Sequence, residues 1–336
     1  MKFFKKILVH ITDPTADKWM MGKAIEIAQR NNAPLTIIGV TEEVPQHLES
    51  LIHENFSLDL QRIIDDRKKS QLQKEIVTFE GKEVEIGYKT VHGRDFREII
   101  KEVLRGSYSL LITRKIQENT LIEKFFGTAT LNLIRECPCP VWIFPPRGEK
   151  RFAKILVSVD TNTTRDDEQE LNGKLLRIAA SIAKNEHGEL HVLHCWEDEG
   201  KDLPEGKFAE IPDQQVKQYN VDAEKKEMEK FQEFLTPYRT TFRDDHIHFY
   251  KDDPGHGIPN ITRNQGIKLL ILGTLGRTGI ERYVIGNTAE RILNRVECSV
   301  LVIKPNGFIS RVALDNDGQD DRNDLNKGQK SRSERS

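Results

Sequence analysis

The 336-residue sequence predicts a tandem α/β protein of two doubly wound domains, each with a five-stranded parallel sheet. Three observations lead to this prediction: an internal repeat, near-continuous apolar runs, and amphipathic segments between those runs. The strings KKILVHITD from Lys5 and AKILVSVD from Ala153 overlay when Ile7 is placed on Ile155. A duplicated chain repeats one supersecondary pattern, so this overlay predicts two copies of one domain.

Each copy continues with the same succession of elements. A helical stretch leads to a second apolar run, PLTIIGVTE from Pro34 and ELHVLHCWE from Glu189. Charged segments with apolar positions at helical spacing follow at residues 58–79 and 213–238. We expect the third strand in VEIGYKTVHGRD and IHFYKDDPGHGIP, the fourth in SYSLLIT and KLLILGT, and the fifth in CPVWIFP and SVLVIKP.

The apolar runs indicate how the strands are buried. Runs such as LLIL and LVI are typical of strands covered on both faces of a parallel sheet. Right-handed crossovers then place helices on both sides of each sheet. We assign residues 1–147 to the first domain and 148–306 to the second. Residues 307–336 are polar and almost free of large apolar groups, so we expect a disordered tail.

The composition excludes several classes of protein. The 51 basic and 53 acidic residues nearly cancel, so no global field favours nucleic acid or an anionic membrane. The start, MKFFKKILVHITDP, resembles a signal peptide, but His10, Thr12 and Asp13 interrupt its apolar stretch, and we interpret it as a first strand. No segment approaches the roughly 18 uninterrupted apolar residues of a membrane span. We expect a soluble, cytoplasmic protein with no nucleic-acid partner and no membrane insertion.

The four cysteines are too few for a disulfide scaffold in a chain of this length. Cys139, Cys195 and Cys298 lie beside apolar runs, where a reduced thiol behaves as a small hydrophobe, and we expect them in the core. Cys137 and Cys139 form a Cys-x-Cys pair, but a four-ligand metal site needs a second pair nearby. We therefore expect no metal there.

Two pairs of histidines occur in expected strands. His191 and His194 are close in one strand, and His246 and His248 share a face of another. The sequence places no further ligand cluster beside either pair, which favours structural histidines over a metal site.

The segment GTLGRTGIERYVIGNTAERIL carries the clearest chemical signal. Gly273 and Gly276 flank a turn after an apolar strand, and Gly286, Asn287 and Thr288 open the next helix. Glycine lets the backbone approach a phosphate, the helix start favours an anion, and the two polar side chains add donors. The alternative is that these glycines serve turns or close packing. The spacing matches neither the dinucleotide fingerprint nor a P-loop.

Both halves resemble the universal stress protein family, over the chain up to about residue 305. The second half is similar through KILVSVD, GTLGRTG, IGNTAERIL and CSVLVIKP, and the tandem arrangement with Gly-Asn in the loop is similar to the E-type two-domain members. The resemblance implies a Rossmann-like fold of the adenine nucleotide alpha hydrolase type.

The resemblance also implies a nucleotide site in the second half. Asp160 corresponds to the acidic residue that meets the adenosine, and the main chain of Cys195 corresponds to the backbone that lines the adenine. The phosphate-binding positions of the family fall on Gly273, Gly276, Gly286 and Asn287. Asn287 replaces the usual Ser or Thr, and its amide keeps a donor for a phosphate oxygen.

The first half departs from this pattern. Counting back along its loop places Arg114 and Gln117 where the second half has Gly273 and Gly276, and these side chains fill the space that a phosphate needs. We expect this half to have lost nucleotide binding of the family type. Arg114 and Lys115 are interpreted as a solvated surface pair rather than a second anion site.

Part of the family pattern survives in the first half. Gly127 and Thr128 stand at the end of the loop. Thr12 aligns with Asp160, and Asp13 lies next to this acidic position.

We therefore expect a cytoplasmic stress-response protein that binds ATP with Mg²⁺, or another adenine nucleotide, in its second domain and acts as a sensor or adaptor. No signature of a dedicated hydrolase triad and no general base is evident. Binding without dedicated catalysis is the prediction, with slow ATP turnover left open.

Two alternative hypotheses of function remain open. In one, the chain is a scaffold that binds no nucleotide: its halves form an intramolecular pseudo-dimer through their last strands and present a surface to an unidentified protein or apolar ligand. In the other, the chain is an enzyme of the wider adenine-nucleotide hydrolase superfold, which fold analogy alone supports.

Overall fold

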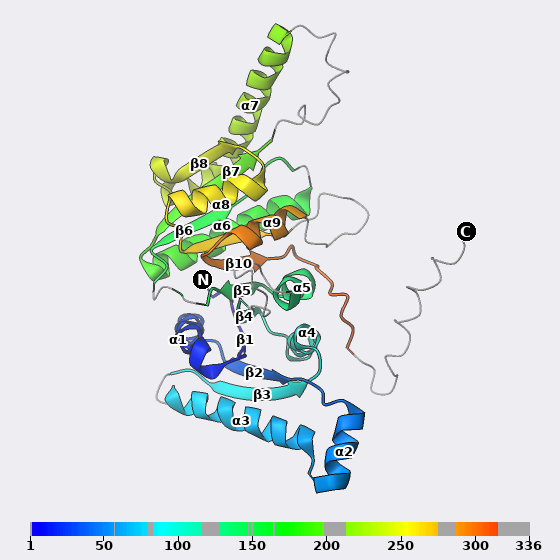
Figure 1. The fold of residues 1–336 in the computed structure, drawn as a ribbon. Coiled ribbons are helices and arrows are strands. Elements are labelled where there is room, and N and C mark those ends of the chain that lie inside the picture. Colours follow the sequence, from blue (N-terminus) through cyan, green and yellow to red (C-terminus); the bar gives the residue numbers. More distant parts are fainter. Residues whose placement is uncertain are drawn as a thin grey trace, which may run out of the picture.

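The strands of both halves join in one ten-stranded sheet with helices on both faces (Figure 1). The computed structural model describes residues 2–56, 58–79, 83–115, 128–146, 148, 151–163, 165–197, 213–274 and 287–314. The strand order is β3-β2-β1-β4-β5-β10-β9-β6-β7-β8.

The elements follow the predicted succession in both halves. Those of the first half are β1 Ile7–His10, α1 Pro14–Asn31, β2 Leu35–Thr41, α2 Gln46–Phe56, α3 Leu60–Thr78, β3 Ile86–His92, α4 Asp95–Gly106, β4 Leu110–Arg114, α5 Thr128–Glu136 and β5 Val141–Phe144. Those of the second half are β6 Lys154–Ser158, α6 Asp166–Glu186, β7 Glu189–Trp196, α7 Asp213–Leu235, the short 3₁₀ helices η3 Thr236–Thr241 and η4 Asp244–His246, β8 Ile247–Lys251, α8 Pro254–Asn264, β9 Leu269–Gly273, α9 Asn287–Arg295 and β10 Ser299–Ile303. The predicted fold class is confirmed. Helix α2 lies before the predicted helical segment 58–79, which corresponds to α3, and was not predicted.

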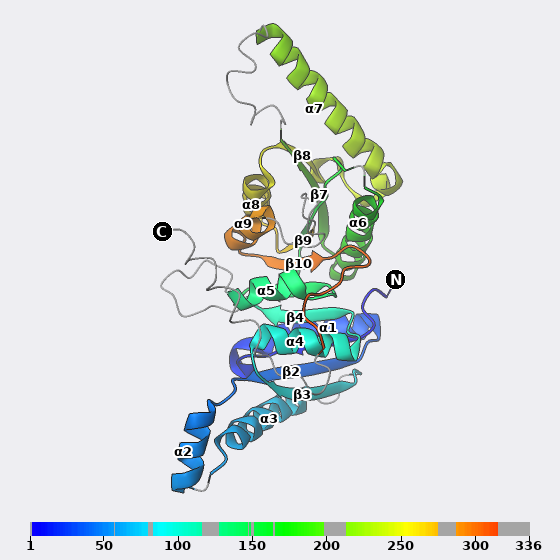
Figure 2. The ribbon, with the colours of Figure 1, turned by 90° about the vertical axis from the view of Figure 1, so that its right-hand side faces the viewer.

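Each half has the doubly wound strand order, with its first strand between the second and the fourth. Apart from β5 and β10, paired strands run parallel. The central strands are buried along their length because helices cover both faces of the sheet. One core lies between the sheet and α1, α3, α6 and α7, and the other between the sheet and α4, α5, α8 and α9 (Figure 2).

The two halves meet where β5 and β10 pair antiparallel, with Trp142 opposite Leu301. The indole of Trp142 stacks on Phe144 and Phe152, with ring centroids 5.7 and 5.6 Å away. The expected pairing through the last strands is thus what joins the halves into a single sheet.

Buried charges reinforce this junction on one face. Lys23 Nζ of α1 donates to both carboxylate oxygens of Glu186 in α6 at 2.9 Å, and both side chains are about 4% exposed. Arg30 and the backbone N–H of Phe152 also donate to this carboxylate. Burial alone would raise the pKa of Glu186, but the hydrogen bonds from Lys23 and Arg30 lower it.

Residues 307–314 continue from β10 onto the first half. Val312 packs against the core beneath α4 and α5, and the Arg311 N–H donates to Glu136 Oε2 at 3.1 Å. Residues 315–336 lie outside the described residues, so the disordered tail stays a prediction. Within the described part of the chain, no helix combines the length and the apolar character needed to cross a membrane.

Candidate functional site

The carboxyl edge of the second half brings three predicted site residues together. Strand β6 lies between β7 and β9 and runs parallel to both. Because neighbouring parallel strands end at the same edge, Asp160, Cys195 and Gly273 meet there. This edge is the switch point of the strand order, where ligands of doubly wound folds bind.

The loop after β6 is held by Asn172 of α6. The Asp160 N–H donates to Asn172 Oδ1 at 3.2 Å, and Asn172 Nδ2 donates to the Asp160 carbonyl at 2.6 Å. The Asp160 carboxylate accepts from the Asn162 N–H at 3.1 Å. The helix thus fixes the backbone at the acidic position.

The thiol of Cys195 belongs to the core, as expected. It is 6% exposed and lies against Gly257 of α8. Burial raises the pKa of Cys195 to about 12, and the nearby carboxylates of Asp252, Asp253 and Glu197 add to the shift. The only group that Cys195 offers toward a ligand at this edge is therefore its main chain.

Gly273 is explained by packing. A Cβ atom on this residue would lie 2.7 Å from Leu171 Cδ2 of α6, closer than real Cβ contacts. The absence of a side chain therefore lets β9 pack closely against the helix. Asn287 and Thr288 begin α9, as expected, whereas Gly276 and Gly286 lie outside the described residues.

Two buried hydroxyls at this edge were missed by sequence reasoning. Thr161 Oγ1 follows Asp160, and Thr274 Oγ1 follows Gly273; neither has a hydrogen-bond partner among the described residues. Thr274 is 7% exposed. The signal in the sequence was their position directly after strand ends that carry predicted site residues.

The same edge of the first half contains an internal ion pair. Arg114 Nε pairs with the carboxylate of Asp17, whose side chain is 0% exposed. The prediction of a solvated surface pair is wrong, because the side chain of Arg114 is 21% exposed and Lys115 is buried. Burial lowers the pKa of Lys115.

Asp17 and Asn172 occupy equivalent positions. Helices α1 and α6 each end at a left-handed residue, Asn32 (φ 51°) and His187 (φ 48°), and counting back 15 residues from each reaches Asp17 and Asn172. Asp17 Oδ2 accepts from the N–H groups of Thr12 and Asp13 at 3.0 and 3.1 Å, just as Asn172 holds the loop after β6. The acidic residue that matters in the first half is thus Asp17 rather than Asp13.

The same count aligns Ala16 with Leu171. Ala16 is smaller than Leu171, and Leu171 is the residue that a Cβ on Gly273 would meet. Three differences therefore distinguish the halves at this edge: Arg114 in place of Gly273, Asp17 in place of Asn172, and Ala16 in place of Leu171.

Comparison with known proteins agrees with the architecture. The Universal stress protein family matches residues 3–145 and again residues 151–304. The chain belongs to the universal stress protein family. Its two matched segments and its similarity to E-type proteins identify a tandem member of that type.

Two named relatives extend over almost the whole chain. Universal stress protein E of Photorhabdus laumondii is 26% identical over 92% of this chain and 97% of the relative. Universal stress protein E of Escherichia coli K12 is 24% identical over 95% of this chain and 100% of the relative.

Solved structures share the fold. The functionally unknown protein PA1789 from Pseudomonas aeruginosa has a TM-score of 0.70 and 21% identity, covering 90% of this chain and 94% of that one. A universal stress protein from Archaeoglobus fulgidus has a TM-score of 0.58 and 16% identity, covering 89% of this chain and 96% of that one.

In this tandem universal stress protein, the two histidine pairs are not separate, in contrast to the prediction. His191 Nδ1 lies 3.0 Å from His248 Nε2, and the ring of His191 stacks on that of His246 with centroids 4.1 Å apart. His194 points to the opposite face, against Phe231 at 5.4 Å. His191, His246 and His248 lie together because β7 and β8 are neighbouring strands, and the sequence alone did not reveal that pairing.

The other three cysteines differ in their burial. Cys137 and Cys139 are buried with their sulfur atoms 3.6 Å apart, and Cys298 is half-buried. Cys139 confirms the expected core position, whereas Cys298 is only partly covered.

Proposed function

We propose that this chain binds an adenine nucleotide, ATP together with Mg²⁺, at the carboxyl edge of its second half and acts as a cytoplasmic sensor or adaptor in the stress response. The observation that supports the proposal is the asymmetry of the two edges. A buried ion pair, Arg114 with Asp17, lies at the edge of the first half. The second half has no side chain at Gly273 and a neutral amide at Asn172.

The two buried hydroxyls support a polar ligand. A buried polar group without a hydrogen bond costs about 1–3 kcal/mol, so Thr161 and Thr274 would regain stability from a ligand oxygen. Helix α9 follows β9 and begins at the carboxyl edge of the sheet, where its first N–H groups favour a phosphate.

The charges at this edge explain why Mg²⁺ belongs to the proposal. The carboxylates of Asp160, Asp252, Asp253 and Glu197 all act on Cys195 from nearby. They would repel a bare triphosphate. Mg²⁺ prefers carboxylate, phosphate and water oxygens, so Asp160 and Asp252 are the residues that would hold it. Asp253 is already paired with Arg291 at 2.6 Å. The ion would supply the charge that lets the phosphates approach.

Calorimetric titration with Mg-ATP tests the proposal. Gly276→Asp adds a negative charge to the loop and should weaken binding tenfold or more, which is about 1.4 kcal/mol. The matched change in the first half, Gln117→Asp, should leave the affinity unchanged. Equal affinity of the wild type and Gly276→Asp, or no binding by the wild type, contradicts the proposal.

Thr274→Val separates a ligand role from a packing role. The substitution keeps the shape and removes the buried hydroxyl without a partner, so the free protein should be at least as stable as the wild type. If the hydroxyl donates to the nucleotide, Mg-ATP should bind severalfold more weakly. Unchanged affinity would remove Thr274 from the site.

Turnover is a separate question. We propose binding without dedicated catalysis, because the sequence carries no signature of a hydrolase triad. Phosphate release from ATP, compared between the wild type and Gly276→Asp, distinguishes slow hydrolysis at this site from a contaminating activity.

A scaffold role is favoured by a different observation. Apolar side chains on and beside α2 are 39–66% exposed: Leu48, Leu51, Phe56, Leu58 and Ile63. Such a patch suits an unidentified protein or an apolar ligand. If Mg-ATP does not bind and a Leu51→Lys, Phe56→Lys variant loses a partner that the wild type retains, the scaffold role is the better account.

A further inference from the structure

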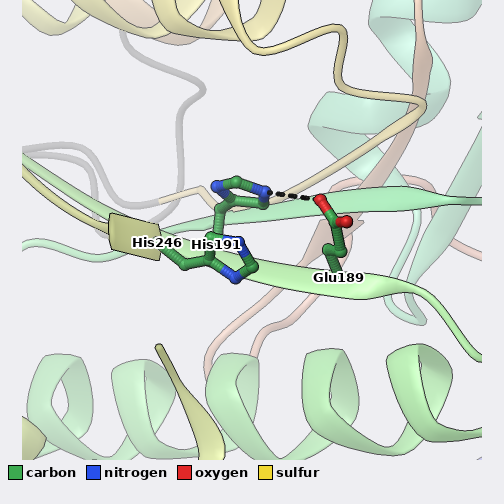
Figure 3. Close-up of side chains that lie close together, drawn as sticks. All are labelled: Glu189, His191 and His246. Carbon is green, nitrogen blue, oxygen red and sulfur yellow. Dashed lines mark ion pairs between the residues drawn. The ribbon is translucent and has the colours of Figure 1, made fainter. Parts of the chain in front are cut away.

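A second cluster of polar side chains lies at the other edge of the same half, away from the proposed nucleotide site. Glu189 and His191 belong to the first residues of β7, and His246 directly precedes β8. Because β7 and β8 pair with Val192 opposite Ile247, His191 and His246 are neighbours across the strands. Figure 3 shows their two rings stacked, with the Glu189 carboxylate beside His191.

The distances fit a bound metal ion after small movements. One ligand atom from each of Glu189, His191 and His246 lies within 4.8 Å of the others. His191 Nε2 is 3.8 Å from Glu189 Oε2. Tetrahedral Zn²⁺ with bonds of about 2.0–2.2 Å holds its ligand atoms about 3.3–3.5 Å apart. The terminal torsion of histidine is broad, so the stacked rings can turn to converge on one ion.

His191 supplies the observation that points to a ligand. Its Nε2 is buried without a hydrogen-bond partner among the described residues, and the side chain is 2% exposed. Its other nitrogen, Nδ1, lies 3.0 Å from His248 Nε2. When Nδ1–H donates to His248, the lone pair of His191 is on Nε2, the nitrogen beside Glu189. This is the arrangement in which a metal-binding histidine is oriented by a second group.

The charges around the cluster favour a transition metal over Ca²⁺ or Mg²⁺. Two imidazoles and one carboxylate suit Zn²⁺, whereas Ca²⁺ and Mg²⁺ prefer oxygen ligands. Lys154 Nζ lies 3.7 Å from Glu189 Oε2, and a bound metal ion would displace this ammonium group from the carboxylate.

We propose that Glu189, His191 and His246 bind Zn²⁺, with water as the fourth ligand and His248 as the positioning residue that orients His191. The site is independent of the nucleotide site, because it lies at the opposite ends of the strands. A bound ion would fasten the edge strand β8 to β7.

Titration of the metal-free full chain tests the proposal. After treatment with a chelator and its removal, the protein should take up one equivalent of Zn²⁺ in calorimetry. Co²⁺ should give the visible absorption of a tetrahedral site and be displaced by Zn²⁺. No saturable Zn²⁺ uptake by the wild type overturns the proposal.

Substitutions assign the ligands. His191→Asn keeps a polar atom near Nδ1 and removes Nε2, and His246→Ala removes the second imidazole; each should weaken Zn²⁺ binding at least about tenfold and abolish the Co²⁺ absorption. His256→Asn changes an exposed histidine of α8 and should leave both readouts unchanged. Binding within twofold of the wild type in both cluster variants overturns the proposal.

Two further variants guard against unfolding and test His248. Glu189→Gln changes a side chain that is 51% exposed, so it should fold normally and still bind Zn²⁺ more weakly. His248→Leu removes the acceptor for His191, whereas His248→Gln keeps one. Weakened binding and an altered Co²⁺ spectrum in the first, restored in the second, identify a positioning role; equal spectra in all three proteins remove His248 from the proposal.

Discussion

The guanidinium of Arg114 lies against the buried carboxylate of Asp17, at the position where the second half has Gly273 and Asn172. The two edges share one backbone plan but differ in what fills them. In the first half, the small Ala16 stands where the second half has Leu171. The two edges differ at three pairs of positions: Arg114 and Gly273, Asp17 and Asn172, and Ala16 and Leu171.

Arg114→Met should therefore destabilise the protein strongly. It leaves Asp17 buried without its cation, and breaking a buried pair costs about 3–5 kcal/mol. Adding Asp17→Asn, the residue found at the equivalent position, should recover much of the loss. Urea denaturation gives the free energies. Arg165→Met, which breaks an exposed pair, should change stability by less than about 1 kcal/mol.

Gly273→Ala should be destabilising because its Cβ would meet Leu171. Overpacking in a well-packed core costs about 1–3 kcal/mol. In the double variant with Leu171→Ala, the loss should be smaller than the sum of the single losses. Gly87→Ala in β3 is the matched control, since its Cβ would have nothing within 4 Å. Additive losses in thermal or urea unfolding would show that the two residues are not coupled.

Lys23→Met should weaken the junction between the halves. Glu186 would stay buried and lose the donor to both of its oxygens, but Arg30 would still pair with it, so the expected cost is about 1–3 kcal/mol. Lys225→Met breaks an exposed pair on α7 and should cost less than about 0.5 kcal/mol. Chemical denaturation compares the two. A similar small effect in both would argue against a stabilising role for Lys23.

Acid should destabilise the protein through His10. Burial, and then the positive charges of Lys68 and Arg114, lower the pKa of His10 from 6.5 to about 3. Between these values the unfolded chain binds a proton that the folded chain does not, so stability falls as pH falls, by about 1.4 kcal/mol per pH unit.

His10→Ser, which introduces the residue found at the equivalent Ser158, should flatten this dependence between pH 6.5 and about 4. The exposed His53→Ser should retain the wild-type slope. Melting temperatures across this pH range provide the measurement. An unchanged slope in His10→Ser would assign the acid sensitivity to other groups, such as His191.

The fold was predictable because its signals are local and repeated. Apolar runs of strand length, helical spacing in between and the overlay of Ile7 on Ile155 needed no knowledge of the tertiary structure. The start of α9 at Asn287 also followed from the sequence. Helix α2 was missed because none of its residues is buried, so no core-facing apolar pattern marks it in the sequence.

The sites were predictable only where neighbours in space were neighbours in the sequence. Arg114 and Asp17 come from β4 and α1, so their pairing required the order of the strands. His191 and His246 met through the register of β7 and β8. The nucleotide positions Asp160, Gly276, Gly286 and Asn287 remain predictions, to be tested by titration.

The antiparallel pairing of β5 with β10 has a consequence for how the protein responds to a ligand. In a dimer of two identical chains, the two subunits that meet at such a junction have the same sequence and therefore carry two equivalent sites. Here the two halves have different sequences. Only the second half has a glycine, Gly273, at the position that Arg114 occupies in the first half. The proposed nucleotide site is therefore single in each chain, and its saturation should follow a simple hyperbola, without cooperativity within the molecule.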